Sequence, residues 1–412
     1  MSNLDSVIKD INSKYKQQLV VTGAVSYNCI KIPFSSPRAN YMTYGGIPLG
    51  RVIEFAGEEN GGKTTTALDL VGNAQKYFLE EYNKEVDRLN NTNKLTKEQT
   101  ARLNYLLDRG PRKVAWVDAE NTFDDTWAIQ LGVDVDSLVK IVPQEQYAEE
   151  IFEMCKELLN TGDIGFMILD SLGILMSKQQ YEKNIEDKTY GGIAMALTRF
   201  SKELCMICGK QKASFIGINQ LRDDMNSMYG GTTTPGGKAW KHHCSLRVMF
   251  RKGSLLDNKY KEVPRKTESP FGHIVMMDVA KTKICKPNRK QGCYTLIYET
   301  GIDKLHDLID ICIMYNCINK AGAWFTFLDP VTGETVENED GSVAKVQGEN
   351  AVRTYLESHH NLCAKYEAYV NHIIEDNDNL DDIADMSVYD EEFEPEPMEA
   401  PNVDEENADE YD

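Results

Sequence analysis

Short apolar runs alternate with amphipathic helical stretches through the middle of the chain. The runs "RVIEFAG", "KVAWVDAE", "IGFMILDS" and "ASFIGINQ" have the length and content of buried strands, and helical patterns separate them. Such alternation is typical of a mostly parallel sheet with helices on both faces. Three later runs, "SLRVMFRK", "HIVMMDVAKTK" and "CYTLIYET", have little helix between them. They predict an antiparallel or mixed extension of the sheet, so the expected fold class is α/β.

The segments around this core predict a division into regions. Residues 1–33 are too few to fold alone and are expected to form an N-terminal packing arm. The core spans 34–300 and includes an extra helical segment at about 80–112 between its first two strands. Helical patterns and a small hairpin over 301–374 predict a small α+β domain. Residues 375–412 contain three prolines and no sustained apolar pattern, so we expect a disordered tail.

The net charge of −20 is concentrated in that tail. From Glu375 to Asp412 there are 18 acidic residues and no Lys or Arg, which leaves 47 acidic against 45 basic residues elsewhere. A nearly neutral body is compatible with nucleic-acid binding, whereas a uniformly acidic one would repel phosphates. No run of 18 apolar residues is present and the first residues are polar, so we expect neither a membrane span nor a signal peptide. The ten cysteines are expected to be reduced thiols, as in a cytosol.

One short stretch, "GEENGGKT", fits the phosphate-loop pattern G-x-x-x-x-G-K-[ST]. It follows a predicted strand and opens a predicted helix, the context in which backbone N–H groups surround phosphates. We expect the Lys63 ammonium to bridge the β- and γ-phosphates of ATP and the Thr64 hydroxyl to ligate Mg²⁺. The predicted nucleotide-binding residues here are Gly57, Glu58, Glu59, Asn60, Gly61, Gly62, Lys63, Thr64 and Thr65.

Polar residues at the ends of the next three strands predict the rest of the site. Asp170 ends "FMILD" and is a candidate second ligand for Mg²⁺. Asp118 and Glu120 end "VAWVDAE", alternate on one face of the strand, and are both candidates to orient the attacking water. Gln220 ends "GINQ", where an amide can contact a γ-phosphate without adding negative charge.

A glycine-rich stretch after Gln220 predicts a DNA-binding surface. The stretch "LRDDMNSMYGGTTTPGGKAWKHH" excludes regular structure, yet it contains Met228 and Tyr229, which can stack on bases. The following residues 238–252 hold five Lys or Arg, two His and no acid. This combination favours single-stranded nucleic acid as a ligand. A second basic run, 281–290, carries two lysines on one strand face, suited either to DNA phosphates or to the ATP of a neighbouring subunit.

In this order, these segments resemble the bacterial RecA recombinases, including divergent and phage-encoded members. The resemblance extends from "GGIPLGRVIEFAGEENGGKTTT" to "GAWFTF" and is most specific at "VDAENTFD", "ILDS", "INQLR" and "AGAWF". It implies a RecA-type ATPase that uses ATP and Mg²⁺ and forms helical filaments on single-stranded DNA. It also implies homologous pairing and strand exchange with double-stranded DNA in the cytosol of a bacterium or a phage-infected cell. Single-strand-binding and loader proteins are the other partners that it suggests.

The resemblance also assigns roles at the ATP site. Glu120 matches the glutamate that activates water in that family, and Asp170 matches the Mg²⁺ aspartate. Gln220 matches the residue that couples ATP to the DNA loop. Asp124 and Trp127 match positions that contact the adenine. The connection between the phosphate loop and the water-activating glutamate is longer than in that family, which gives the extra segment no role.

For DNA, the resemblance places residues 183–191 and 221–237 on the two DNA-binding loops of the family. It makes Lys281 and Lys283 a pair that completes the ATP site of the neighbouring subunit. The sequence departs from the family at Met195, because the family has an arginine that faces DNA at this position. The predicted DNA-binding residues are Tyr190, Lys202, Arg222, Met228, Tyr229, Gly236, Gly237, Lys238, Lys241, Arg247 and Arg251.

Two other functions share such a core. A hexameric helicase would need closed rings and unwinding, and the Lys281 and Lys283 pair favours the recombinase. A structural or regulatory filament would hold ATP without turnover, which the complete set of Lys63, Glu120 and Gln220 argues against. The acidic tail resembles a DNA strand in charge, so we expect it to compete with incoming duplex unless it serves only solubility.

Overall fold

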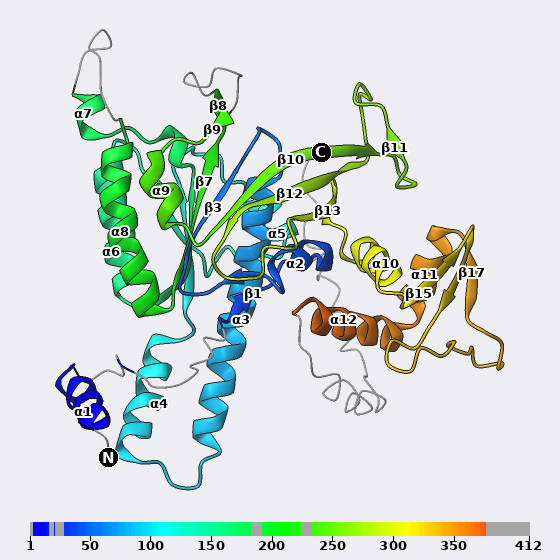
Figure 1. The fold of residues 1–412 in the computed structure, drawn as a ribbon, viewed down its shortest axis with the longest axis horizontal. Coiled ribbons are helices and arrows are strands. Elements are labelled where there is room, and N and C mark those ends of the chain that lie inside the picture. The colour runs from blue at the N-terminus through cyan, green and yellow to red at the C-terminus, as the bar shows by residue number, and fades with distance from the viewer. Residues whose placement is uncertain (1–2, 16–19, 21–28, 183–191, 224–231, 376–412) are drawn as a thin grey trace, which may run out of the picture. The chain divides into compact units, whose positions relative to one another are not determined.

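The computed structural model describes residues 3–15, 20, 29–182, 192–223 and 232–375 (Figure 1). The chain divides into two compact units, residues 1–307 and 308–412. The predicted acidic tail from 376 onward and most of the two predicted DNA-binding loops lie outside the described residues.

A ten-stranded sheet forms the centre of the first unit, and its strands follow the order β14-β13-β12-β10-β3-β7-β6-β4-β5, with β11 paired to β10. The strands from β10 to β5 are parallel, and the others are antiparallel. The predicted parallel sheet with an antiparallel extension is therefore confirmed. The bounds are β3 (Val52–Gly57), β4 (Lys113–Asp118), β5 (Val139–Ile141), β6 (Ile164–Asp170), β7 (Ser214–Gln220), β10 (Leu246–Leu256), β11 (Glu262–Val263), β12 (Gly272–Thr282), β13 (Gln291–Ile297) and β14 (Gly301–Ile302).

Helices cover both faces of this sheet because successive strand residues point to opposite sides. In β4, Val114 and Trp116 pack in the cluster that contains α3, whereas Ala115 and Val117 pack in the cluster that contains α6 and α8. Both clusters are almost free of solvent. The helices and short strands of this unit are α1 (Asn3–Tyr15), β1 (Lys31–Ile32), α2 (Pro37–Thr43), β2 (Ile47–Pro48), α3 (Lys63–Asn90), α4 (Lys97–Arg109), α5 (Asp125–Gln130), α6 (Ala148–Asn160), η1 (Leu172–Ile174), α7 (Lys178–Tyr181), α8 (Ala194–Gln211), β8 (Arg222–Asp223), β9 (Thr232–Thr233) and α9 (Gly237–His243).

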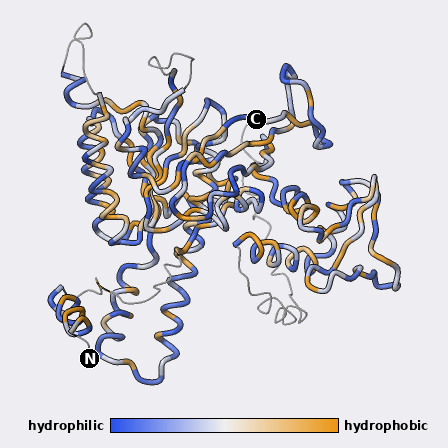
Figure 2. The backbone as a smooth tube through the Cα atoms, viewed as in Figure 1, coloured by the Kyte–Doolittle hydropathy of each residue, from blue (hydrophilic) through white to orange (hydrophobic). Residues whose placement is uncertain are grey.

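The long connection between β3 and β4 folds as two helices. Helix α3 continues without a break to Asn90, and α4 returns toward the sheet (Figure 1). A capping box starts α4: the Thr96 hydroxyl accepts the Gln99 N–H at 3.1 Å, and the Gln99 side chain accepts the Thr96 N–H at 2.8 Å. Hydrophilic residues predominate along the far half of α3 and along α4 (Figure 2). This pair of helices therefore packs without an extensive apolar core of its own.

The second unit contains a small antiparallel sheet in the order β15-β16-β17 and helices α11 and α12. Tyr366 of α12 is buried, and its hydroxyl bonds the carbonyls of Cys317 at 3.0 Å and Leu328 at 2.9 Å. Helix α10 crosses from the first unit into the second. No helix in the described part of the chain has the length and apolar content needed to cross a membrane. The bounds are α10 (Lys304–Met314), β15 (Ile318–Ala321), β16 (Trp324–Phe327), β17 (Lys345–Gln347), α11 (Glu349–Ser358) and α12 (His360–Ile374).

Candidate nucleotide site

The phosphate loop joins β3 to α3 at the carboxyl edge of the parallel strands. Gly57 and Gly62 have φ angles of 158° and 93°. A Cβ atom on Gly57 would lie 2.2 Å from the Phe250 carbonyl oxygen, and one on Gly62 would lie 2.8 Å from Val275, so both positions require glycine. The predicted loop residues thus form a turn whose backbone leads directly into the first turn of α3.

Lys63 is the first residue of α3 and is nearly buried. Its ammonium donates to the carbonyls of Gly57 at 3.1 Å and Glu58 at 2.5 Å, so it lies against the inner side of the loop. Burial lowers the Lys63 pKa, while the carboxylates of Asp170 and Glu120 oppose this shift. A buried cation held beside the loop is the group needed to neutralise phosphate oxygens.

Asp170 ends β6 next to the start of α3. Its carboxylate accepts the Thr64 hydroxyl at 2.9 Å. Burial raises the Asp170 pKa to about 6, and the nearby Glu120 carboxylate adds to this shift. A hydroxyl and a carboxylate presented together are oxygen donors of the kind that Mg²⁺ prefers. The residues present therefore fit a magnesium ion, with Thr64 and Asp170 as its protein ligands.

Asp118 and Glu120 at the end of β4 have different hydrogen-bond partners, although the residue pattern alone made both candidates to orient the attacking water. Both oxygens of Asp118 accept backbone N–H groups, from Thr122 at 3.1 Å and Phe123 at 3.0 Å. Asp118 therefore holds the turn after β4. Glu120 instead accepts hydrogen bonds from the Ser171 hydroxyl and from Gln220 Nε2, the latter at 3.3 Å. The structure brings Glu120 and Gln220 together beside Asp170.

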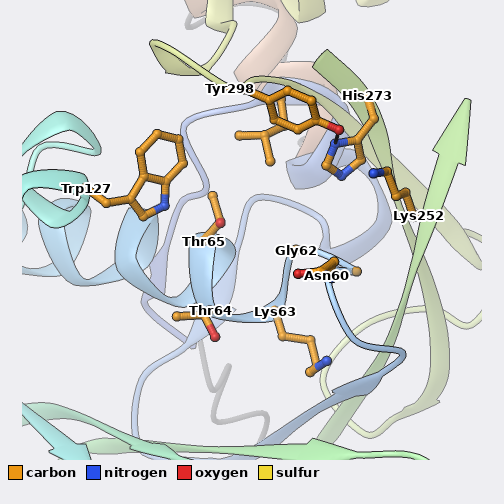
Figure 3. A pocket seen from close by; sticks show the side chains of 11 residues that line it. Asn60, Gly62, Lys63, Thr64, Thr65, Trp127, Lys252, His273 and Tyr298 are labelled. Carbon is orange, nitrogen blue, oxygen red and sulfur yellow. Dashed lines mark hydrogen bonds between the residues drawn. The ribbon is translucent and has the colours of Figure 1, made fainter. Parts of the chain in front are cut away.

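A cavity of about 470 Å³ opens from the phosphate loop (Figure 3). Residues 60–65 line one side, and Trp127 of α5 lines another. The remaining wall contains Lys252, His273 and Tyr298. The sequence had indicated Lys252 only as part of the basic run 238–252 predicted to bind DNA, and no pattern had indicated His273 or Tyr298. Their contribution depends on β10, β12 and the end of β13 lying beside β3, so only the sheet pairing brings them to the site.

Two groups around this cavity are already engaged in local contacts. Asp124, predicted to contact adenine, caps α5 by accepting the Trp127 N–H at 3.1 Å. His273 is buried, its Nδ1 lies 3.1 Å from the Tyr298 hydroxyl, and its Nε2 is buried without a hydrogen-bond partner in the described part of the chain. Burial and the nearby Lys252 lower the His273 pKa to about 4, so the imidazole is neutral at pH 7.

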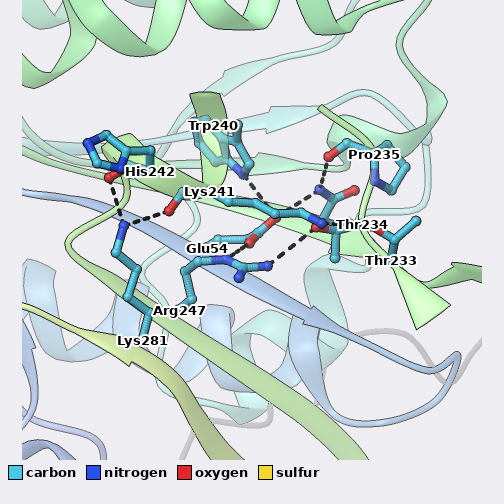
Figure 4. Close-up of polar contacts among 10 residues, drawn as sticks. Glu54, Thr233, Thr234, Pro235, Trp240, Lys241, His242, Arg247 and Lys281 are labelled. Carbon is cyan, nitrogen blue, oxygen red and sulfur yellow. Dashed lines mark hydrogen bonds and ion pairs between the residues drawn. The ribbon is translucent and has the colours of Figure 1, made fainter. Parts of the chain in front are cut away.

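A buried glutamate behind the phosphate loop connects four segments (Figure 4). Glu54 of β3 is fully buried and forms an ion pair with Arg247 of β10. The same carboxylate accepts Trp240 Nε1 at 2.9 Å and Asn219 Nδ2 at 2.9 Å. Asn219 also donates to the Pro235 carbonyl at 2.9 Å. The Glu54 carboxylate therefore ties β3 to β7, β10 and α9, and Asn219 extends the network to the chain before α9.

The two lysines of the second basic run lie at the end of α9. Lys281 Nζ donates to the carbonyls of Lys241 at 2.6 Å and His242 at 2.7 Å, and Lys283 Nζ donates to the His242 carbonyl at 3.0 Å. Cations at this position satisfy helix carbonyls that have no partner within the helix. Their predicted role at a neighbouring ATP site remains a prediction.

The predicted DNA-binding residues lie in several different environments. Lys202 and Lys238 are exposed. Arg222 donates to the Gly173 carbonyl at 3.0 Å, and Lys241 donates to the Thr233 hydroxyl at 2.7 Å. Arg251 pairs with Asp278 at 3.1 Å.

Arg247 is the least available of these cations because it belongs to the Glu54 network. Gly236 and Gly237 begin α9 with φ angles of 102° and 74°, so the expectation that the whole stretch 221–243 lacks regular structure is wrong from Gly237 onward. Tyr190, Met228 and Tyr229 lie outside the described residues.

A parallel sheet with a phosphate loop, a paired threonine and aspartate, and a nearby glutamate at its carboxyl edge defines a protein of the phosphate-loop class. The family model for the RecA N-terminal domain matches residues 104–303. Protein RecA from Fusobacterium nucleatum is 30% identical over 344 residues, which cover 83% of this chain and 76% of that protein. The chain belongs to the RecA family.

Other relatives support the same assignment. Protein RecA from Mesoplasma florum is 30% identical over 80% of this chain and 83% of its own length. Protein RecA from Rhodopirellula baltica is 31% identical over 71% of this chain and 66% of its own length. At this level of identity, the chain is a divergent member of the family.

Proposed function

We propose that this protein is an ATP-dependent homologous recombination protein. With ATP and Mg²⁺ it assembles on single-stranded DNA as a helical filament and pairs that strand with homologous duplex. DNA stimulates hydrolysis, and hydrolysis releases the DNA. The observation that carries the proposal is the 3.3 Å hydrogen bond from Gln220 to Glu120, because Gln220 immediately precedes the glycine-rich DNA loop.

The residues of the site have separate tasks in this proposal. Lys63 and the loop N–H groups hold the phosphates, and Thr64 and Asp170 hold Mg²⁺, which would neutralise charge on the transferred phosphoryl group. Glu120 orients the water and accepts its proton. Gln220, bonded to Glu120, moves when DNA positions the following loop. A change at the DNA surface thereby reaches the carboxylate that acts on water.

The walls farther from the phosphates hold the base and ribose. Trp127 and Tyr298 present aromatic rings to the cavity, which suits a purine. Neutral His273 lines the same wall and holds its Nδ1 3.1 Å from the Tyr298 hydroxyl. Lys281 and Lys283 reach the ATP of the next protomer, and their present bonds to the end of α9 would then be exchanged for phosphate contacts.

The other regions support assembly and control. Residues 1–33 form the arm that packs on the next protomer, and residues 34–300 form the ATPase and DNA-binding core. Residues 301–374 form a small domain. The acidic residues 375–412 compete with incoming duplex for the basic surface. We place the activity in the cytosol of a bacterium or a phage-infected cell, where loader or single-strand-binding proteins assist.

The direct test is ATP hydrolysis with and without single-stranded DNA at modest salt and excess Mg²⁺. We expect strong stimulation, together with open helical filaments in electron micrographs of the ATP-bound protein on DNA. A hydrolysis rate that DNA leaves unchanged, although anisotropy shows that DNA is bound, would contradict the coupling through Gln220. Closed rings that unwind duplex would instead identify a helicase.

A further inference from the structure

A second large cavity lies at the opposite end of the parallel strands, under the inserted helices. It measures about 550 Å³, slightly more than the 470 Å³ of the phosphate-loop cavity. The far half of α3 and residues 102–109 of α4 form two walls. Residues just before three strands form the third: Arg112 before β4, Thr161 and Gly162 before β6, and Gln211 and Lys212 before β7. We call this space the insertion cavity.

The helix faces that line the insertion cavity are polar and aromatic. On α4, Arg102, Tyr105 and Arg109 recur at helical spacing and all face the cavity. On α3, Tyr82 and Glu85 do the same. Facing stripes of two packed helices are normally apolar, because that is how a helix pair buries surface. This pair encloses polar groups instead, which favours a ligand site over a packing interface.

Positive charge predominates in the insertion cavity. Six cationic side chains and two carboxylates, those of Glu81 and Glu85, line it, and Asp163 just outside the lining pairs with Arg109 at 3.9 Å, which leaves a surplus of three positive charges. Glu85 is already paired with Arg88, at 2.9 and 3.0 Å. Gathering the remaining cations raises the energy of the free site, and a bound anion would offset this repulsion. The cations are Lys84, Arg88, Arg102, Arg109, Arg112 and Lys212.

Two of these arginines contribute to the site in different ways: Arg112 is a held, partly buried charge, and Arg102 is a cation without a hydrogen-bond partner in the described residues. Arg112 donates to the carbonyls of Gln211 at 3.0 Å and Lys212 at 3.2 Å, but its buried Nε has no partner in the described part of the chain. Burial lowers the Arg112 pKa. Within the same described ranges, Arg102 makes no hydrogen bond or ion pair, and its guanidinium lies 5.7 Å from the centre of the Tyr105 ring.

Tyr105 forms a flat platform between these cations. The Arg109 guanidinium lies 5.1 Å from its ring centre, and 46% of the Tyr105 surface is exposed. Aromatic rings and guanidinium planes stack on nucleic-acid bases, and arginines bind phosphate with two hydrogen bonds. Cations and a stacking platform within one cavity of nucleotide size match both parts of a nucleotide.

We propose that the insertion cavity binds a nucleotide unit, a phosphate ester with a planar base, at a site separate from the phosphate loop. Arg102 and Arg112 bind the phosphate, and Tyr105 stacks on the base. The nucleotide is a free nucleoside phosphate or one unit of a DNA strand, and both present the same chemistry to the cavity. The insertion thus gives this chain a second nucleotide site.

The test counts bound ADP on the full-length protein by equilibrium dialysis. The wild type is expected to bind two ADP per chain. Arg102→Ala combined with Tyr105→Ala is expected to weaken the second site roughly tenfold to a hundredfold and to leave the first unchanged. Lys97→Ala is the matched control, because Lys97 is an exposed cation on the same helix outside the cavity. It should retain both sites.

Photolabelling with 8-azido-ADP locates the second bound nucleotide independently of the binding count. The expected result is a labelled tryptic peptide containing Tyr105, in addition to a label near the phosphate loop. The same labelling is repeated with a short oligo(dT) that carries an azido base. One ADP per chain in the wild type, with no label in α4 from either probe, would overturn the proposal. An oligo(dT) that displaces only the second ADP identifies a DNA strand as the source, and two retained ADP identify the free nucleotide.

Discussion

The two cavities of the first unit lie at opposite ends of the same parallel strands and are built in different ways. At the phosphate loop, residues 57–62 must include glycines at set positions, because the backbone there passes close to Phe250 and Val275. In the insertion cavity, the polar wall consists mainly of side chains from α3 and α4. A loop whose backbone is constrained in this way therefore leaves a recognisable motif in the sequence. A side-chain wall leaves only a helical periodicity that many solvent-exposed helices share.

Helix α3 contributes to both cavities. Lys63 and Thr64 line the first, and Tyr82 and Arg88 line the second. At about 1.5 Å per residue, these two ends of the helix are roughly 25 Å or more apart. Direct electrostatic influence across that distance is weak in salt. We therefore expect substitutions at one cavity to leave ligand binding at the other intact.

The largest expected effect is on hydrolysis. Glu120→Gln should lower the rate of ATP hydrolysis about 100- to 10,000-fold, because the amide cannot accept the proton of the attacking water. The measurement is single-turnover hydrolysis in the presence of DNA, with ADP binding at both cavities followed in parallel. Glu145→Gln removes an exposed carboxylate from the same unit and should retain the wild-type rate. Wild-type hydrolysis by Glu120→Gln would remove Glu120 from the mechanism.

The packing beneath the insertion cavity provides the next test. Phe78 is buried on α3, and the Arg112 guanidinium lies 5.0 Å from its ring centre. Phe78→Ala should lower the free energy of unfolding by about 3–4 kcal/mol through lost burial and a new void. The neighbouring Leu79 is 49% exposed, so Leu79→Ala should cost less than about 0.5 kcal/mol. Urea unfolding curves measure both, and equal losses would show that the base of the cavity is not packed as described.

The Glu54 network tests the support of the phosphate loop. Glu54→Gln leaves an oxygen for Trp240 but removes the charge that pairs with Arg247, and this should cost about 3 kcal/mol of stability. Glu58→Gln, at an exposed position in the loop, serves as the control. Adding Arg247→Met to Glu54→Gln should restore part of the loss in urea unfolding. If the second substitution makes the loss larger, the two charges do not act as a pair.

A smaller effect is expected for the pH dependence of stability, through His273 in the wall of the phosphate-loop cavity. In the unfolded chain, an imidazole binds a proton below about pH 6.5, whereas folded His273 remains neutral down to about pH 4. The unfolded state therefore binds more protons in that interval, and the free energy of unfolding falls as pH falls. Between pH 7 and 4.5, the wild type should lose about 2 kcal/mol more stability than His273→Gln.

Exposed His242 provides the control for this measurement. His242→Gln replaces an exposed side chain on the same unit and should follow the wild-type dependence on pH. Lys252 and Tyr298 face His273 in both proteins and do not change the comparison. Identical pH dependence in the wild type and His273→Gln would mean that solvent reaches the imidazole in the folded protein.

Much of the fold and part of the site were predictable from the chain. The alternation of apolar runs and helices indicated the parallel sheet, because each buried strand needs a crossover helix to reach the next parallel position. The carboxyl ends of neighbouring parallel strands share one edge. For that reason Asp170, Glu120 and Gln220 could be expected near Lys63, and the structure places the four together.

Other features depended on the register and pairing of distant segments. Tyr298 and His273 line the cavity because β12 and the chain after β13 pair beside β10, a register that local sequence does not specify. Arg247 belongs to a basic run, yet its partner Glu54 lies on a strand far away in sequence. Basic residues in a run are therefore not equally available to DNA.

By itself, the sequence determined the fold class, the phosphate loop and the family of this protein. The fold class and the phosphate loop follow from local rules: period-2 and helical patterns, glycines that the loop backbone requires, and strand ends that share an edge. The family follows from the resemblance of several segments, in order, to the RecA recombinases. Only the tertiary structure decided that Asp118 holds a turn while Glu120 bonds Gln220, and that the inserted helices enclose a basic cavity. Those outcomes depend on which hydrogen bonds and side chains meet in space, and residues distant along the chain supply them.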